Sequence, residues 1–164
     1  MPIPLLRSAS VEDVDAFTEV FLECWRVSYG MSMPESLVES ITQVRAHALW
    51  QDALEHGGDT YVAAEHPEGR IAGFIGYRMI DAGTGYVSSL YVSPGTQGGG
   101  LGRELLAEAE AAMRRLDARR ARLWVFEQNE PSRRFYERSG WRLDGSRVTL
   151  EEWGQPQVGM AKEL

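Results

Sequence analysis

The sequence lacks most of the features that would place it in a specialised class of protein. Its single cysteine, Cys24, cannot form a disulfide within the chain, so the fold needs no oxidising compartment. It contains no run of about 18 apolar residues, which argues against a membrane-spanning helix. The N-terminal residues show no charged and then apolar leader, and we therefore expect a cytoplasmic protein.

Positive charge is also scarce. The 24 acidic residues outnumber the 17 basic ones and give a formal net charge of −7, which works against binding to nucleic acid or to an anionic membrane. The histidines, His47, His56 and His66, do not have the close spacing of metal ligands, so we expect no metal site and predict that they face solvent. Cys24 lies in an apolar stretch, which favours a buried thiol over a nucleophile.

The 164 residues contain no repeat, linker or low-complexity segment, which predicts one domain spanning residues 1–164. Apolar periodicity and turn residues predict a mixed α/β fold in the order β-αα-βββ-α-β-α-ββ. Ser10, with Asp13 three residues later, is expected to cap the first helix. The predicted elements are a strand within 3–9, helical segments over 11–25 and 35–56, strands at 60–65, 71–80 and 86–92, a helix over 101–116, a strand at 121–127, a helix over 131–139 and two strands within 141–164.

What the chain does have is a glycine-rich connection, VSPGTQGGGLGRELL, between a predicted strand and a predicted helix. Unpaired backbone N–H groups and the positive end of the helix dipole would meet there, so an anion is the expected ligand. A nucleotide-binding P-loop would need Lys and then Ser or Thr after its last glycine, but Arg103 and Glu104 follow Gly102. The spacing also differs from that of a dinucleotide-binding fingerprint.

The residues from Gln97 to Gly102 resemble the Q/R-G-x-G-x-G/A signature of the GCN5-related N-acetyltransferases, the GNAT family. Downstream, LWVFEQNEPSRRFYERSGW is similar to the second motif of that family, with Asn129 and Tyr136 seven residues apart. The two motifs span residues 86–141, and the predicted strand order is similar to the family fold. The resemblance implies a mostly antiparallel sheet of about seven strands with flanking helices, in a member of bacterial type.

The resemblance also implies acetyl-coenzyme A (acetyl-CoA) as cosubstrate. Its pyrophosphate would lie on the glycine loop, its pantetheine arm along the exposed backbone of the preceding strand, and its amides near Asn129 and Ser132. Both polar residues are also good helix caps, and this alternative stays open. The implied cofactor-binding residues are Leu90, Tyr91, Val92, Gln97, Gly98, Gly99, Gly100, Leu101, Gly102, Arg103, Asn129 and Ser132.

Tyr136 is the implied general acid, which would protonate the departing thiolate. Some relatives carry a glutamate base near the start of the strand before the loop or within the strand that leads into the second motif; the nearest positions here are Tyr86 and Trp124, so the base is open. Glu127 is one candidate, and a water held by Ser88 is the other. Trp25 and Tyr29 lie in the region that shapes the acceptor cleft in the family, although aromatic clusters are more often core.

These expectations combine into an N-acetyltransferase that moves an acetyl group from acetyl-CoA to a primary amine by direct attack in a ternary complex. The acceptor is open between a polyamine or antibiotic-like amine, a protein amine and an amino-acid-like metabolite. The alternative is a CoA-binding regulatory module that has lost the chemistry. The family resemblance also implies a possible homodimer through the terminal strands, and the acidic net charge predicts no nucleic-acid or membrane partner.

Overall fold

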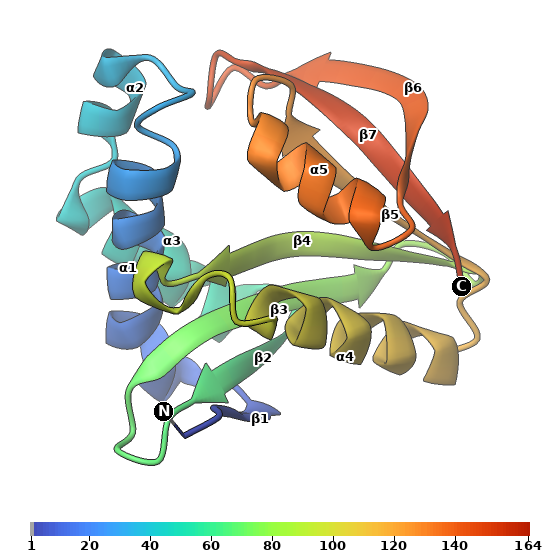
Figure 1. The fold of residues 1–164 in the computed structure, drawn as a ribbon, viewed down its shortest axis with the longest axis horizontal. Coiled ribbons are helices and arrows are strands. Elements are labelled where there is room, and N and C mark those ends of the chain that lie inside the picture. The colour runs from blue at the N-terminus through green and yellow to red at the C-terminus, as the bar shows by residue number, and fades with distance from the viewer. Residues whose placement is uncertain (1) are drawn as a thin grey trace.

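The computed structural model describes residues 2–164 and contains a seven-stranded sheet with helices on both faces (Figure 1). The strands are β1 (Leu5–Ser8), β2 (Thr60–Glu65), β3 (Ile71–Met79), β4 (Thr84–Val92), β5 (Arg120–Phe126), β6 (Arg142–Thr149) and β7 (Pro156–Glu163). Their spatial order is β1-β2-β3-β4-β5-β7-β6, and every neighbouring pair is antiparallel except β4 and β5, which are parallel. The predicted fold class is confirmed.

The helices begin and end largely where the sequence predicts. They are α1 (Val14–Glu23), α2 (Glu35–Ser40), α3 (Gln43–His56), α4 (Leu101–Arg115) and α5 (Glu130–Arg138), with short helical turns at Val11–Asp13, Cys24–Ser28 and Pro94–Thr96. Ser10 and Asp13 form a capping box before α1, as expected. No helix in the described part of the chain is long and apolar enough to cross a bilayer.

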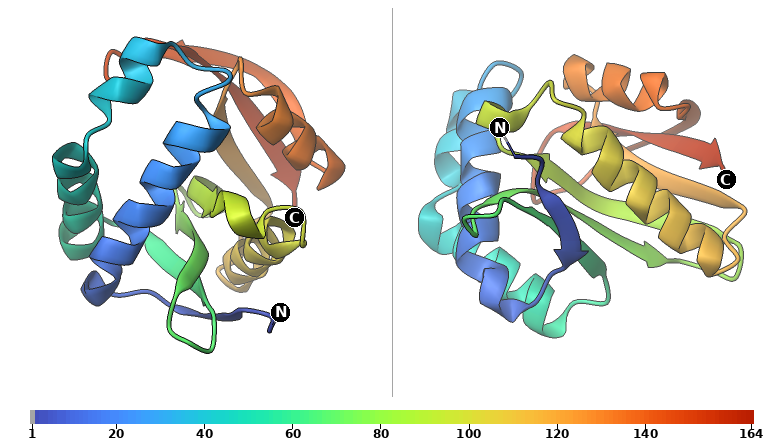
Figure 2. Two further views of the ribbon diagram at one scale, coloured as in Figure 1. Left: turned by 60° about the vertical axis from the view of Figure 1, so that its left-hand side comes forward. Right: turned by 60° about the horizontal axis from the view of Figure 1, so that its bottom comes forward.

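Two hydrophobic cores lie on opposite faces of the sheet, because successive side chains of a strand point to opposite sides. Phe74 of β3 packs with α1 and α3, whereas its neighbour Ile75 packs with α4 and α5. The two layers of helices are visible on either side of the sheet in Figure 2. The site described below lies where the two layers meet at the cleft between β4 and β5.

The prediction of one helix over residues 35–56 is wrong in one respect, because the structure has two helices there, α2 and α3. Ile41 leaves the helical conformation after α2, and the Thr42 side chain accepts a 3.2 Å hydrogen bond from the Arg45 backbone as the cap of α3. The break rotates α3, so that Val44 is 81% exposed while Ala46 and Trp50 are buried. A capping threonine thus begins a second helix inside the single helix that the spacing predicts.

β4 and β5 separate partway along their length. Their pairing ends at Val87 with Leu123, although β4 continues to Val92. Next to this point, Ser88 is left out of the register between β3 and β4, which is the pattern of a β-bulge. The last residues of β4 therefore have no strand partner on the β5 side, and the space between the strands opens into a cleft.

A buried polar cluster ties α4 to the residues around the end of α5. The Glu110 carboxylate on α4 accepts hydrogen bonds from the Trp141 indole at 3.0 Å and from the Lys162 ammonium at 2.9 Å. Lys162 also donates to the backbone oxygen of Ser139 at 2.9 Å. These contacts hold α4 and α5, whose residues border the cleft, in one relative position.

Candidate active site

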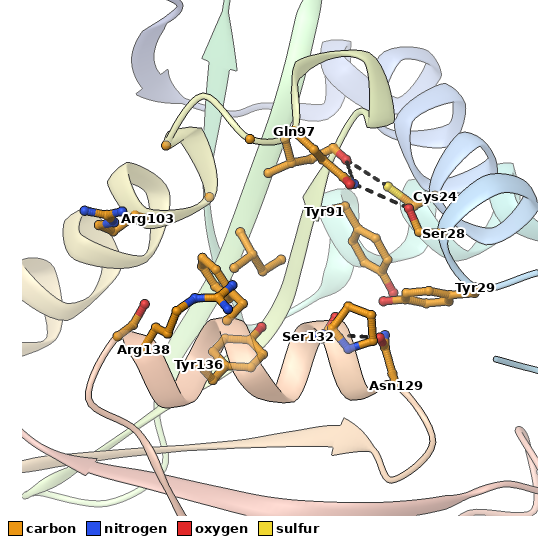
Figure 3. A pocket seen from close by; sticks show the side chains of 18 of the residues that line it. Cys24, Ser28, Tyr29, Tyr91, Gln97, Arg103, Asn129, Ser132, Tyr136 and Arg138 are labelled. Atoms are coloured by element: carbon orange, nitrogen blue, oxygen red, sulfur yellow. Dashed lines mark hydrogen bonds between the residues drawn. The ribbon is translucent and has the colours of Figure 1, made fainter. Parts of the chain in front are cut away.

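A cavity of about 1040 Å³ occupies the cleft beside the free end of β4. It is bordered by the end of α1, the last residues of β4, the glycine loop with the start of α4, and one face of α5 (Figure 3). All the predicted cofactor residues line it except Gly99 and Leu101. Leu101 is buried in the core beneath the loop, and Gly99 is exposed beside it.

The glycine loop has the conformation that an anion cradle needs. Gly98 and Gly100 both have φ near +88°, a backbone conformation that residues other than glycine rarely adopt. Gly100 is the residue before α4, and no side chain caps the helix there. The first backbone N–H groups of α4 are thus unsatisfied at the positive end of its dipole. Arg103 and Arg138 line the same cavity and add positive charge.

The end of α1 is shaped by a π-helical turn, Cys24–Ser28, which is closed by a 3.0 Å hydrogen bond from the Tyr29 backbone N–H to the Cys24 carbonyl. Such single turns recur at functional sites because the extra residue re-aims the side chains that follow. Here Cys24, Ser28 and Tyr29 all line the cavity. Burial raises the pKa of the Cys24 thiol to about 12, so the thiol is protonated at neutral pH.

The side chain of Gln97 folds back onto β4 instead of extending over the loop. Its amide donates to the backbone oxygen of Val92 at 2.9 Å and to the Ser28 hydroxyl at 3.4 Å, and the Cys24 thiol donates to the same Val92 oxygen at 3.2 Å (Figure 3). These contacts join the end of α1 to the mouth of the glycine loop.

Tyr29, Tyr91 and Tyr136 come together from three different elements. The hydroxyl ends of Tyr29 and Tyr91 lie close to each other near Ser132, and Tyr136 projects from α5 farther along that helix (Figure 3). Burial raises the pKa of all three phenols above the ordinary value. Each phenol is therefore protonated at neutral pH, which makes it a proton donor and excludes it as a resting base.

The positions of Asn129 and Ser132 fit both interpretations of the sequence, contact with the cofactor and capping of a helix. The Asn129 side-chain oxygen accepts a 3.3 Å hydrogen bond from the Ser132 backbone N–H and caps α5. Both residues also line the cavity. Capping is thus compatible with contact to a ligand, and the cofactor role of these residues stays a prediction.

The two candidates for the base lie in different surroundings. Glu127 borders neither cavity and forms an ion pair with Arg147 of β6 at 3.1 Å, and this hydrogen-bonded partner lowers the pKa of the carboxyl. That placement disfavours Glu127. Ser88 lies at the bulge of β4, and its hydroxyl oxygen is buried without a hydrogen-bond partner.

A second cavity, of about 210 Å³, adjoins the first and shares the three tyrosines with it as lining residues. Trp25 and Ser88 line this second cavity, and Tyr29 lines both, so the structure brings these predicted residues together. The residues shared by the two cavities are Tyr29, Leu90, Tyr91, Asn129, Ser132 and Tyr136. A group bound in one cavity would meet a group bound in the other at this junction.

Sequence reasoning missed several residues of the first cavity, among them Arg138, Phe135 and Ser139. A signal was available, because Ser132, Phe135 and Ser139 recur at the spacing of one helix face. The expectation that all histidines face solvent is wrong for His66, which is 4% exposed behind the turn between β2 and β3. Residues 2–164 contain no cluster of three or more His, Cys, Asp or Glu side chains placed to share a metal ion.

Comparison with known proteins agrees with this geometry. The family model described as the acetyltransferase (GNAT) family matches residues 14–141. The spermidine N(1)-acetyltransferase of Thermoplasma acidophilum is 27% identical over 154 residues, which cover 90% of this chain and 95% of that protein. An uncharacterised N-acetyltransferase of Bacillus subtilis, YuaI, is 26% identical over 171 residues. This match covers 97% of this chain and 96% of that protein.

Among solved structures, an N-acetyltransferase of Thermoplasma acidophilum in complex with coenzyme A superposes with a TM-score of 0.77 at 23% identity and covers all of both chains. A GCN5-related N-acetyltransferase of Rhodopseudomonas palustris gives a TM-score of 0.81 at 19% identity, with 100% and 98% of the chains covered. At these identities the two structures show a shared fold.

Proposed function

Because this chain belongs to the acetyltransferase (GNAT) family and is thus an N-acetyltransferase that uses acetyl-CoA, we propose that it transfers the acetyl group to a primary amine by direct attack within a ternary complex. The observation that carries the proposal is the pair of joined cavities. One is suited to the cofactor and the other to the acceptor, and they meet at Tyr136.

In this assignment the larger cavity holds the cofactor. The pyrophosphate lies on the backbone N–H groups at the start of α4, with Arg103 and Arg138 beside it. The pantetheine arm follows the edge of β4 from Leu90 to Val92, which has no strand partner on the β5 side, toward the junction. Phosphate at a helix N-terminus and an extended amide arm along a free strand edge use the two kinds of backbone group that the cleft leaves unsatisfied.

Tyr136 acts as the general acid. The amine nitrogen attacks the thioester carbonyl carbon, the carbon–sulfur bond breaks, and the coenzyme A sulfur leaves with the electron pair. The Tyr136 hydroxyl, which its raised pKa keeps protonated, donates a proton to that sulfur. The phenolate then recovers a proton from solvent.

The attacking amine must lose a proton, and no carboxylate in the described chain lines either cavity. We therefore assign the proton to a water held by the Ser88 hydroxyl, which is buried at the β4 bulge without a protein partner. The name of the Thermoplasma acidophilum relative, a spermidine acetyltransferase, supports an amine as acceptor.

The first test is calorimetric titration of the purified protein with acetyl-CoA and with free coenzyme A, followed by thiol release in the presence of primary amines. We expect binding in the micromolar range for both and amine-dependent thiol release. Absence of binding to both molecules would overturn the cofactor assignment. Binding with thiol release that is independent of any amine would overturn the amine acceptor.

A further inference from the structure

The second cavity has an unusual lining. All the residues of the described chain that border it are uncharged, and about half of them are aromatic. Trp25 stacks on Trp153 with ring centres 5.4 Å apart, and Phe126 meets both edge-on at 5.9 and 6.2 Å. The first cavity contrasts with it, because two arginines border the space there.

Four polar atoms in this lining are buried and have no hydrogen-bond partner: the indole nitrogens of Trp25 and Trp50, the Ser88 hydroxyl and the side-chain oxygen of Gln157. Buried polar groups are ordinarily paired, so a cluster of unpaired ones in one cavity marks a place where a ligand or water completes them. The indoles are donors only, the hydroxyl donates and accepts, and the amide oxygen accepts. The cavity thus offers both kinds of hydrogen bond without a charge.

The size of the cavity limits the acceptor. An engineered apolar cavity of about 150 Å³ takes up benzene. The space here is about 210 Å³, which is enough for one ring with a short side chain. A flat ring would also complete the edge-to-face packing of the surrounding rings.

Resting on the proposed function, we propose that the acceptor is a compact arylalkylamine, a primary monoamine whose aromatic ring carries a hydrogen-bonding group. The ring fills the second cavity, its polar substituent pairs with the buried indole, hydroxyl or amide atoms, and the amine points back to the junction at Tyr136. A polyamine fits this lining poorly, because its further ammonium groups would be buried among uncharged residues, and unpaired buried charges are strongly unfavourable.

The uncharged lining also favours the chemistry. An ammonium group loses stability when it leaves water, so burial shifts the amine toward the neutral form that attacks the thioester. The aromatic faces offset part of this cost through cation–π attraction while the amine enters. A carboxylate in the wall would hold the amine in its protonated, unreactive form.

The test compares tyramine, 2-phenylethylamine, hexylamine and spermidine by thiol release from acetyl-CoA, and by calorimetric binding to the protein saturated with coenzyme A. We expect kcat/KM for tyramine to exceed that for spermidine by at least about tenfold, since a further buried ammonium costs more than the 1.4 kcal/mol that corresponds to that factor. We also expect kcat/KM to decrease from tyramine to 2-phenylethylamine and from 2-phenylethylamine to hexylamine. Spermidine equal to or better than tyramine would overturn the inference.

Gln157→Glu sharpens the test, because it places one carboxylate in the wall at nearly constant shape. We expect the ratio of kcat/KM for spermidine over tyramine to rise at least about tenfold, as a charge partner becomes available to the polyamine. Gln128→Glu is the matched control, since Gln128 is exposed and borders neither cavity. An unchanged ratio in Gln157→Glu would contradict the assignment of the second cavity to the acceptor.

Failure of this inference can be told apart from failure of the proposed function. If coenzyme A binds but no monoamine binds to the complex, the acceptor class is wrong and the cofactor assignment stands. If neither acetyl-CoA nor coenzyme A binds, the proposed function itself fails. Thermal melting of both variants, compared with the unchanged protein, confirms that the readouts come from folded protein.

Discussion

The two cavities that meet at Tyr136 differ in both chemistry and origin. The larger one is bordered by helix-terminal backbone groups and two arginines, and much of its lining comes from one continuous segment, residues 90–103. The smaller one is aromatic and uncharged, and its rings come from α1, α3, β4, β5, α5 and the turn before β7. The end proposed to bind phosphate is thus encoded locally, whereas the end proposed to bind the acceptor exists only after the chain has folded.

This difference makes the two halves separable by mutation. If the proposed assignment is right, we expect a change in the glycine loop to alter cofactor affinity and not acceptor affinity, and a change in the aromatic wall to do the reverse. Residues at the junction belong to both cavities and act on turnover. Variants in one cavity that change only the affinity for its own ligand would support this difference between the cavities, and variants that change both affinities would contradict it.

The largest effect is expected from Gly100→Glu. The new side chain must adopt φ near +88°, which costs about 1–2 kcal/mol, and its carboxylate faces the position assigned to the pyrophosphate. We expect the Kd for acetyl-CoA to rise by about 100-fold, measured by calorimetry. Gly95→Glu is the control, because Gly95 lies outside the cavity lining, has no positive φ and has open space around it. Equal affinities of the two variants would remove the glycine loop from the cofactor site.

An effect of similar size, on turnover instead of affinity, is expected from Tyr136→Phe at the junction. Loss of the proton donor should lower kcat by about 100-fold while the Kd for acetyl-CoA changes little. Because burial raises the pKa of Tyr136, the hydroxyl of the unchanged protein stays protonated through neutral and mildly alkaline pH. Deprotonation of Tyr136 should therefore not lower the rate in that pH range. Tyr77→Phe, a buried tyrosine away from both cavities, is the control. Equal turnover in the two variants would assign the acid elsewhere.

The same division explains what the sequence predicts well. The glycine spacing, the strand before it and the helix after it are contiguous, and local rules place all three: the structure has β4 ending at Val92 and α4 beginning at Leu101. The hairpin and the order of elements along the chain follow from alternation and turn residues, and the family resemblance is confirmed by the match over residues 14–141. Each of these features depends on neighbours in the chain.

The features that were missed depend on contacts distant in sequence. Trp153 became part of a cavity wall only because the turn before β7 packs it on Trp25, 128 positions away in the chain. His66 is buried by the packing around its turn, and its polar neighbourhood in the sequence gave no sign of this. The break between α2 and α3 depends on which of two competing local signals, cap or stripe, the tertiary packing favours.

A moderate effect on the cofactor side alone is expected from Arg138→Gln. Arg138 is exposed at the cavity rim, so its attraction for phosphate is screened by solvent, and we expect the Kd for acetyl-CoA to rise by about five- to tenfold at low salt. The difference should shrink as salt is added. Arg134→Gln on the same helix, where Arg134 pairs with Glu130 outside the cavity, is the control. If tyramine affinity fell as much as cofactor affinity, the two cavities would not be separable at this residue.

The smallest effect is expected from Cys24→Ala. Its size distinguishes direct attack from a mechanism in which the thiol carries the acetyl group. The thiol borders the cofactor cavity and would be the obvious carrier if the acetyl group first moved to the enzyme. Its pKa of about 12, raised by burial, leaves almost no thiolate at pH 8, and its one hydrogen bond, to the Val92 oxygen, is of a weak kind. Direct attack therefore predicts that kcat changes by less than about threefold. Loss of turnover, together with an acetylated protein detected by mass spectrometry in the unchanged chain, would replace the ternary complex with a covalent intermediate and make the junction a relay between the two cavities.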